Sequence, residues 1–317
     1  MKITTATVED IHYAYRLLLG REPDEEGLRF HSQSLCQRPQ SPAELAMAFL
    51  SSQEFVARTH PLPVEVPLNG YSVFVRPEDR DIGRHIEKTG QYEPHVSAAV
   101  SECLRPGNVF VDVGANIGFF TNMAAHLVGE RGVVVAVEPM DKNLQLIYRG
   151  IERNAFKHVR VHACAASDRT QIVSMATGAA TSNGQVIPAS STTQQLFAQA
   201  KPLDPLLADL ERIDLIKLDI EGYELLAWRG LHRSLERHRP LVLSEFHPFC
   251  MRTHVGIEPL DYLAALFAYG EVTILHHEGG TTRCATPTEV MQQWAIADKA
   301  MRDDGKHHLD LSIKPRQ

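Results

Sequence analysis

Short apolar runs separated by longer amphipathic segments dominate the chain from about residue 109 onward. Each run is rich in Val, Leu, Ile or Ala, and an acidic residue lies near its carboxyl end. Runs of this kind are typical of buried parallel strands, and the amphipathic segments between them predict covering helices. The expected strands are Val109–Val113, Val133–Val137, Val159–Ala163, Leu215–Leu218 and Leu241–Ser244.

Near the C-terminus the pattern changes. Two strand-like segments, Glu271–Leu275 and Leu309–Ile313, flank a helix-like segment at Pro287–Met301. They predict an antiparallel pair that closes the edge of the sheet. The chain is therefore expected to have an α/β fold, with a Rossmann-like mixed sheet and helices on its faces.

The first sixty residues carry only helical periodicity. Apolar residues recur at helical spacing over Ile11–Leu19 and over Leu28–Leu35. Ser41–Glu44 combines an N-cap serine, a proline at the first helical position and a capping-box glutamate. An apolar face then continues over Leu45–Val56. This pattern predicts a small all-α domain.

Three parts of the chain follow from these patterns. Residues 1–60 form the helical accessory domain, and the proline-rich segment at 60–63 is a linker. Residues 61–108 hold a hairpin at Val64–Val75, predicted by alternation around an Asn-Gly pair, and a helix that contains Val96–Leu104. Residues 109–317 form the core domain.

Composition narrows the class of protein. The net charge of −7 argues against a nucleic-acid surface, which normally shows a basic patch. The five cysteines are scattered and include no C-x-x-C pair, which indicates reduced thiols rather than a disulfide framework or a zinc site. No export signal and no apolar run of membrane-spanning length stands out, so we expect a cytoplasmic protein without a membrane span.

A glycine-containing turn links the first core strand to the amphipathic helix at Phe119–Val128. Gly114 permits a tight turn, and Gly118 lets the helix begin close to a ligand. Asn116 stands where a dinucleotide-binding fingerprint has its second glycine, and Asp112 would repel a diphosphate. An acid at this point suits a cationic ligand such as S-adenosylmethionine.

Acids near the ends of the other strands extend this expected cofactor site. Glu138 fits hydrogen bonding to ribose hydroxyls, and Asp168 fits contact with an adenine amino group. Each acid taken alone is equally compatible with a solvated loop or a helix N-cap, but that explanation is poor for all of them together. The expected cofactor-binding residues are Asp112, Gly114, Asn116, Gly118, Phe119, Glu138, Asp168 and Asp219.

From about Pro63 to the C-terminus, the sequence resembles the FkbM family of S-adenosylmethionine-dependent methyltransferases. The resemblance implies a class I methyltransferase fold and, for most members, O-methylation of saccharide or polyketide hydroxyls. It also suggests that Tyr92 and Glu93, which match a family motif, cover the cofactor or substrate; a solvated helix N-terminus is the alternative. Glu221 is a further expected substrate-binding residue. The segments that carry the resemblance are Gly90–Pro94, Val109–Thr121, Val137–Pro139, Leu203–Asp204 and Ile213–Gly230.

A second resemblance concerns the N-terminal domain. Tyr13–Glu26 and Ser51–Phe55 are similar to a bacterial helical domain of unknown function that often accompanies enzymes of surface-polysaccharide assembly. This resemblance implies a docking or glycan-binding role, and a packing appendage is the alternative.

Methyl transfer to a hydroxyl requires a base near the acceptor oxygen. His247 is the preferred candidate because imidazole titrates near neutral pH, although a structural histidine before Pro248 is the alternative. Glu245 shares its strand face and is expected to orient the imidazole or bind substrate. Asp219 is the third candidate catalytic residue, and it would alternatively cap the following helix.

The same side chains suggest a metal site that the spacing does not demand. Asp219, Glu245 and His247, together with Glu221, offer ligands for Mg²⁺, which would bind substrate hydroxyls. Lys217 lies inside an apolar strand and is expected to pair with a carboxylate.

The leading hypothesis is an S-adenosylmethionine-dependent O-methyltransferase acting on a saccharide, glycolipid or polyol hydroxyl in surface-glycan synthesis. Transfer to a polyketide or another small-molecule hydroxyl is the first alternative. A nicotinamide-dependent oxidoreductase is disfavoured by Asp112 and Asn116. A non-catalytic binding module is the remaining alternative.

Overall fold

The computed structural model describes residues 5–59, 62–177, 182–187 and 196–316. The chain divides into two compact units. Residues 1–63 with 76–78 make up the first, and residues 64–75 with 79–317 make up the second. In the described residues, no helix is both long enough and apolar enough to cross a membrane.

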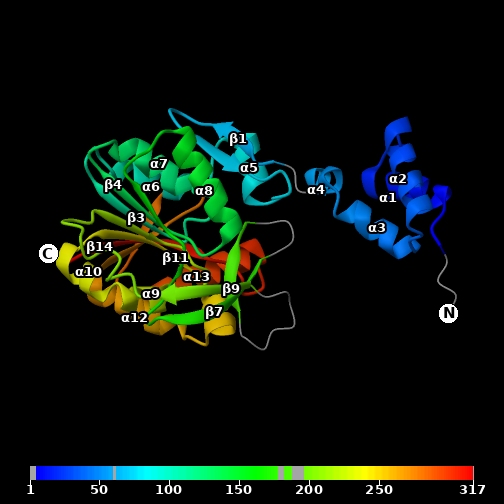
Figure 1. Cartoon of the computed structure of the whole chain (residues 1–317). Coiled ribbons are helices and arrows are strands. Elements are labelled where there is room, and N and C mark those ends of the chain that lie inside the picture. Colours follow the sequence, from blue (N-terminus) through cyan, green and yellow to red (C-terminus); the bar gives the residue numbers. More distant parts are fainter. Residues whose placement is uncertain (1–4, 60–61, 178–181, 188–195, 317) are drawn as a thin grey trace. The chain divides into compact units, whose positions relative to one another are not determined.

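The first unit is helical (Figure 1). Its small core holds Ile11, Tyr15 and Phe49. A capping box at Ser41 and Glu44 begins the third helix, as the sequence predicts. The helices are α1 (Val8–Leu19), α2 (Glu25–Gln37), α3 (Pro42–Leu50) and α4 (Gln53–Thr59).

The apolar face expected over Leu45–Val56 is divided between α3 and α4. The hydroxyl of Ser51 donates to the carbonyl of Met47 at 2.8 Å, and Ser52 Oγ accepts from the amide of Phe55 at 3.1 Å. Serines that bond to nearby backbone groups compete with the helix and favour its ends. A single helix across this segment was therefore the wrong expectation.

The second unit is built on a mixed sheet with the strand order β13-β12-β14-β11-β10-β3-β4-β5. The five strands predicted for the core are parallel neighbours, and β14 lies antiparallel between β11 and β12. The closing pair is therefore confirmed, with β13 as an additional edge strand. The bounds are β3 (Val109–Val113), β4 (Val133–Val137), β5 (Val159–His162), β10 (Leu215–Leu218), β11 (Leu241–Phe246), β12 (Gly270–Leu275), β13 (Thr281–Cys284) and β14 (Leu309–Pro315).

Helices cover both faces of this sheet (Figure 1). One face packs against α6 (Pro94–Cys103), α7 (Phe119–Val128) and α8 (Asp141–Arg153). The other packs against α9 (Glu224–Gly230), α10 (His232–His238), α12 (Pro259–Tyr269) and α13 (Pro287–Met301). The remaining helices are α5 (Ile82–Thr89), α11 (Pro248–Cys250) and the π-helix η1 (Met251–Val255).

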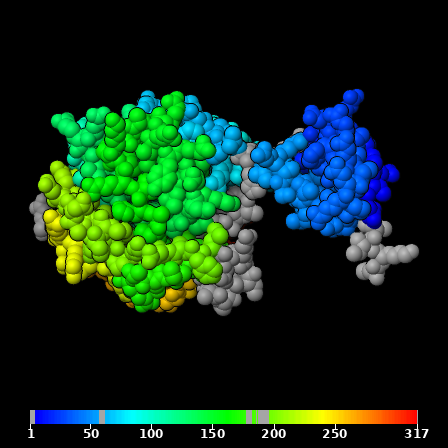
Figure 2. Space-filling view, viewed as in Figure 1, coloured from blue at the N-terminus to red at the C-terminus, as the bar shows by residue number. Residues whose placement is uncertain are grey.

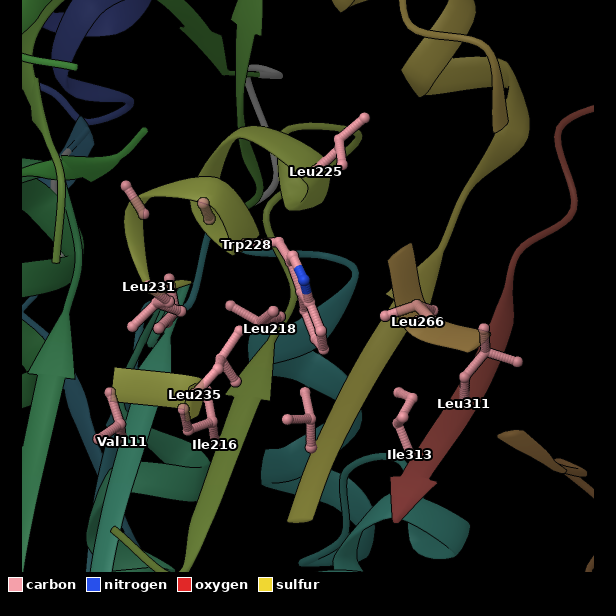
Figure 3. Close-up of a cluster of buried hydrophobic side chains, with 14 of the residues drawn as sticks. Val111, Ile216, Leu218, Leu225, Trp228, Leu231, Leu235, Leu266, Leu311 and Ile313 are labelled. Atoms are coloured by element: carbon pink, nitrogen blue, oxygen red, sulfur yellow. The ribbon is translucent and has the colours of Figure 1, made fainter. Parts of the chain in front are cut away.

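The larger core lies under α9 and α12. In Figure 3, Trp228 reaches from α9 toward the sheet between Leu218 and Leu266. Leu218 and Leu266 are fully buried, and burying such a side chain contributes roughly 1.5–3 kcal/mol. This packing holds the ends of β10 and β11 in place, and those ends carry the acids discussed below.

Residues 64–75 form the predicted hairpin, with β1 (Val64–Pro67) antiparallel to β2 (Ser72–Val75). The amide of Ser72 donates to Asn154 Oδ1 at 2.8 Å, just beyond the end of α8. The hairpin is therefore attached to the helical layer of the second unit.

A second, smaller sheet has no counterpart in the sequence prediction. Its strand order is β6 (Ala165–Ala166), β9 (Leu196–Lys201), β7 (Gln171–Thr177) and β8 (Gly184–Ile187). Val173 and Met175 are buried with Met140, whereas Ile172 and Phe197 are exposed. Figure 2 shows the green atoms of this part of the chain on the surface of the larger unit.

Candidate active site

A cavity of about 360 Å³ lies at the carboxyl ends of β3, β4, β10 and β11. This volume is within the range of small-molecule sites, and such edges are where open α/β sheets bind ligands. Of the described residues, five acids and a single lysine line it: Glu93, Glu138, Asp219, Glu221, Glu245 and Lys217. The cavity is therefore lined with carboxyl groups that can bond to a ligand with many hydroxyl groups.

The turn after β3 forms one wall of the cavity. Gly114 has a φ of 85°, and a Cβ there would lie 1.8 Å from the backbone oxygen of Asp219. Only glycine therefore allows the ends of β3 and β10 to approach this closely. Asn116 also has a left-handed backbone, with a φ of 50°, and its amide group donates to Asn183 Oδ1 at 2.9 Å.

Gly118 does not face the cavity. A Cβ on Gly118 would lie 2.9 Å from Ile147 Cγ1 on α8, so this glycine permits close packing of two helices. Its expected role beside a ligand stays a prediction, and the structure gives this glycine a packing role. Phe119, the next residue, does line the cavity.

Glu138 is held at the end of β4 by three hydrogen bonds. Its carboxylate accepts from the amides of Asn116 and Met140, both at 2.9 Å, and from Asn143 Nδ2 at 3.3 Å. Burial raises the pKa of Glu138 to about 7 against these hydrogen bonds, which lower it. The carboxyl group lines the cavity in a fixed position.

Asp112 is fully buried and is not part of the cavity wall. Thr121 Oγ1 donates to its Oδ2 at 2.6 Å, and Lys217 is its register partner on β10. Burial raises the pKa of Asp112, whereas Lys217 and Thr121 lower it. Asp112 points into the layer between β3 and α7, so its proposed contact with the cofactor stays a prediction that this cavity wall does not support.

Asp168 also lies outside the cavity wall. It follows β6, which leaves the main sheet and pairs with β9, and it does not line the cavity. Its Oδ1 accepts from the hydroxyl of Ser167 at 3.3 Å. The wall on this side is apolar instead, and it consists of Cys164, Ala165, Ala166, Met175 and Val186.

The opposite end of the cavity holds the three candidate catalytic residues. Asp219 Oδ2 lies 2.5 Å from Lys217 Nζ, as the burial of a lysine in an apolar strand predicts. Glu245 is the last-but-one residue of β11, and His247 follows that strand directly. All three predicted residues line the same cavity.

His247 is a neutral imidazole at pH 7. Burial, followed by the neighbouring His308 and His254, lowers its pKa to about 4. Its Nδ1 is buried and has no hydrogen-bond partner. Glu245 Oε2 also lacks a partner, so these two atoms do not form the imidazole-orienting bond that the sequence suggested. Glu245 Oε1 lies 3.9 Å from His308 Nδ1 instead.

Two acids at this end of the cavity, Glu245 and Glu93, have raised pKa values, which favour their neutral forms. Burial raises the pKa of Glu245 well above its usual range and that of Glu93 to about 8. Glu93 has a left-handed backbone, with a φ of 41°, and its Oε2 has no hydrogen-bond partner. Tyr92 lines the cavity beside it, with its ring 5.7 Å from that of Phe119.

The expected magnesium ligands are not assembled as predicted. In the described residues, the group that includes His247 consists of Glu221, His247 and Cys250, with one donor atom from each within 4.8 Å of the others. Cys250 Sγ donates to Glu221 Oε2 at 3.8 Å, and Glu221 has a left-handed φ of 54°. Asp219 and Glu245 are outside this group because Lys217 and the β11–β14 layer hold them elsewhere.

Some wall residues carried no signal in the sequence. Met175 and Val186 come from the unpredicted small sheet, and His308 comes from the segment before β14. Asn143 is the exception, since an amide five residues after Glu138 at a helix start is a recognisable partner for that acid.

Family comparison decides which class of α/β protein this is. Residues 112–270, half of the chain, match the model of the methyltransferase FkbM domain. The chain belongs to the FkbM methyltransferase family. Its mixed sheet is therefore the class I fold of S-adenosylmethionine-dependent methyltransferases. Residues 4–59 match a domain of unknown function (DUF4214).

Similar solved structures include three methyltransferases. The FkbM methyltransferase of Methylobacillus flagellatus is 18% identical, with 95% of this chain and 58% of that chain covered and a TM-score of 0.42. An S-adenosylmethionine-dependent O-methyltransferase of Thermotoga maritima is 11% identical, with 74% and 71% covered and a TM-score of 0.36. An S-adenosylmethionine-dependent methyltransferase of Aquifex aeolicus is 16% identical, with 48% and 62% covered and a TM-score of 0.29. This FkbM methyltransferase spans 58% of the length of the Methylobacillus flagellatus protein. No curated protein matches it.

Proposed function

We propose that this FkbM methyltransferase transfers a methyl group from S-adenosylmethionine to a hydroxyl of a saccharide, glycolipid or polyol. The observation that carries the proposal is the pairing, in one cavity, of an acidic wall with a neutral imidazole at His247. The carboxyl groups of this wall suit a polyhydroxylated acceptor, and a cationic methyl donor would favour their ionised forms. The imidazole is available to accept a proton.

The residues fit the cofactor in three places. The carboxyl group of Glu138, fixed by backbone amides, is placed to accept hydrogen bonds from ribose hydroxyls. The apolar wall that includes Ala165 and Met175 suits an adenine ring. The Gly114 turn, where no Cβ intrudes, and Asp219 suit the positively charged part of the molecule. Asn116 and Phe119 complete the proposed set.

The bound cofactor supplies a methyl group that its sulfonium charge already activates. The protein must therefore orient the acceptor oxygen and remove its proton. His247 is the proposed base, since its Nδ1 has no hydrogen-bond partner among the described residues. Its lowered pKa keeps it neutral at pH 7 but makes it a weak base, so it would take the proton as the oxygen attacks the methyl group rather than before.

The acceptor is inferred from the polarity of the wall near His247. Glu93, Glu221 and Glu245 offer carboxyl oxygens to several hydroxyl groups of one molecule, and Tyr92 adds an aromatic ring. Such a surface suits a sugar or polyol better than an extended apolar polyketide, which would leave these buried polar groups without partners. Surface-glycan synthesis is the proposed context.

The test has a binding arm and a transfer arm. Calorimetry of the full chain should detect S-adenosylhomocysteine, whereas binding of NAD alone would contradict the proposal. The protein is then incubated with S-adenosylmethionine carrying a labelled methyl group and a panel of saccharides, glycolipids and polyols. Mass spectrometry should locate the label on oxygen.

His247→Gln provides the matched variant. It should still bind S-adenosylhomocysteine, because His247 is not among the proposed cofactor ligands, and it should lose most of the transfer activity. Unchanged transfer in this variant would exclude His247 as the base. Tight cofactor binding with no acceptor among hydroxyl compounds would favour a binding module, and label on nitrogen or carbon would reject O-methylation.

A further inference from the structure

A cluster of histidines lies beside the cavity but outside its wall. His95 is near the start of α6, His277 follows β12, and Asp310 is on β14. One donor atom from each lies within 4.8 Å of the others. His95 Nε2 is 2.6 Å from Asp310 Oδ2, and His277 Nε2 is 3.6 Å from the same oxygen. The two imidazole rings are stacked, with centroids 4.3 Å apart.

We propose that His95, His277 and Asp310 form a binding site for a divalent transition-metal ion, with Zn²⁺ as the preferred occupant. Two imidazoles and one carboxylate are a common three-ligand set for such ions, and they leave further positions for water. This site is distinct from the proposed base and cofactor ligands, so it does not depend on the proposed function.

The donors are arranged as metal ligands are. The three donor atoms lie within 4.8 Å of one another, and His277 Nε2 lies 3.6 Å from the carboxylate oxygen that already accepts a hydrogen bond from His95. Two stacked imidazoles would repel each other if both were protonated, whereas one cation shared between neutral rings avoids that cost. The geometry thus favours one ion over two protons.

Burial also supports the proposal. The side chain of His95 is only 5% exposed and that of Asp310 11%, so neither polar group is well hydrated. His95 Nδ1 is buried without a hydrogen-bond partner. Without an ion, the 2.6 Å hydrogen bond to Asp310 places the proton on Nε2, so binding of an ion there would move the proton to Nδ1 or release it. His277, at 48% exposure, leaves a route from solvent.

An ion at this site would link the chain segments that carry two acids of the cavity, Glu93 and Glu245. His95 is two residues from Glu93, whose left-handed backbone turns its side chain into the cavity. Asp310 is the register partner of Glu245 on β11. Binding would therefore join α6, β12 and β14 and hold both acid-bearing segments in position. We expect the ion to raise the stability of the fold, since a ligand that binds only the folded state stabilises it.

Glu221, His247 and Cys250 form the competing group. It differs in containing a thiol, and burial raises the pKa of Cys250 well above its usual range, so a thiolate is disfavoured there. This difference gives the two sites distinct spectroscopic signatures. A cobalt ion bound to a thiolate shows an intense charge-transfer band that a site of imidazoles and a carboxylate lacks.

The experiment uses the full chain, freed of metal with a chelator and titrated with ZnCl₂ by calorimetry. One ion should bind, and His277→Ala and Asp310→Asn should each weaken binding by about tenfold or more. His276→Ala is the matched control, because His276 precedes His277 but is hydrogen-bonded to Thr282 Oγ1 at 2.7 Å. The control should bind Zn²⁺ as the parent does.

Two further readouts keep the outcome clear. Zn²⁺ should raise the melting temperature of the parent and of His276→Ala but not of His277→Ala, and circular dichroism should show that all variants fold. Co²⁺ should bind without a thiolate charge-transfer band. Three results would each overturn the proposal. They are no binding of Zn²⁺ to the parent, equal Zn²⁺ affinity of His277→Ala, Asp310→Asn and His276→Ala, and a thiolate band in the Co²⁺ spectrum. Binding of S-adenosylhomocysteine, measured in parallel, tests the proposed function separately.

Discussion

Lys217 on β10 and Asp219, the residue that directly follows this strand, form an ion pair with Nζ 2.5 Å from Oδ2. Their spacing places both side chains on the same face of the strand. Burial lowers the pKa of Lys217. The nearby carboxylates of Asp219, Glu93 and Asp112 together raise it by more, so the net shift of this pKa is upward. The lysine therefore stays charged and compensates the acids around it.

Removing this charge should destabilise the fold strongly. Lys217→Met leaves Asp219 and the fully buried Asp112 without their cation, and breaking a buried pair typically costs about 3–5 kcal/mol. Urea unfolding should show this loss in the free energy of unfolding. Lys314→Met is the control, because Lys314 is an exposed strand lysine, and it should change stability by less than about 0.5 kcal/mol. Equal stability of the two variants would contradict the role given to Lys217.

The pKa of His247 should be directly measurable. Burial and the facing groups His308, His254 and His307 lower it, Asp219 raises it, and the result is about 4. An NMR titration of the histidine ring protons should therefore contain one resonance that moves near pH 4, and that resonance should be missing in His247→Gln. A midpoint near the ordinary value would show that the imidazole is solvated.

The same shift makes stability depend on pH. The folded state resists protonation of His247, whereas the unfolded chain binds a proton at about pH 6.5. The contribution of His247 is thus fully present above pH 6.5 and declines as the pH falls toward 4. His247→Gln should lose less stability than the parent between these two pH values, measured by denaturant unfolding at each.

Glu138 lines the cavity and Asp168 does not, so substitutions of these two acids should have different effects on cofactor affinity. Glu138→Gln removes the charged acceptor proposed for the ribose hydroxyls, and the dissociation constant for S-adenosylhomocysteine should rise about tenfold or more. Asp168→Asn should leave it unchanged. Calorimetry on variants with matched melting temperatures provides the measurement, and a larger loss in Asp168→Asn would reverse the assignment.

Gly114 and Gly107 have nearly the same backbone conformation but differ in how crowded an added Cβ would be. Comparing their alanine variants therefore distinguishes the cost of backbone strain from the cost of steric crowding. Gly114 and Gly107 have φ values of 85° and 89°, but a Cβ at Gly107 meets nothing within 4 Å. Gly107→Ala should cost only the left-handed strain, about 1–2 kcal/mol. Gly114→Ala should cost clearly more and should weaken binding of S-adenosylhomocysteine, because the turn must move away from Asp219. Similar unfolding free energies for both variants would show that the turn yields easily.

Much of the fold was predictable because the responsible interactions are local. The strands at Val109–Val113 and Val133–Val137 and the helix at Phe119–Val128 have the predicted bounds, since apolar runs, a glycine turn and amphipathic periodicity specify them directly. The small sheet was not predictable. Its strand Gln171–Thr177 mixes polar and apolar residues, and its pairing with β9 depends on contacts formed across more than twenty residues of chain.

The candidate site was predictable in kind more than in detail. Acids near strand ends were expected to meet at one edge, and Glu138, Asp219 and Glu245 do line one cavity. Asp112 and Asp168 do not line it, because strand alternation turns the first toward α7 and a change of sheet carries the second away. One residue of difference along a strand reverses the face to which a side chain points.

By itself, the amino-acid sequence determined the order of strands and helices and their resemblance to a methyltransferase, because turn, cap and periodicity signals act between near neighbours. Only the tertiary structure decided which charges meet. Asp112 faces Lys217 across 105 residues, and His95 meets Asp310 across 215. Strand register and helix packing select such pairs from many acids and bases, and both arise from burial of the whole apolar core.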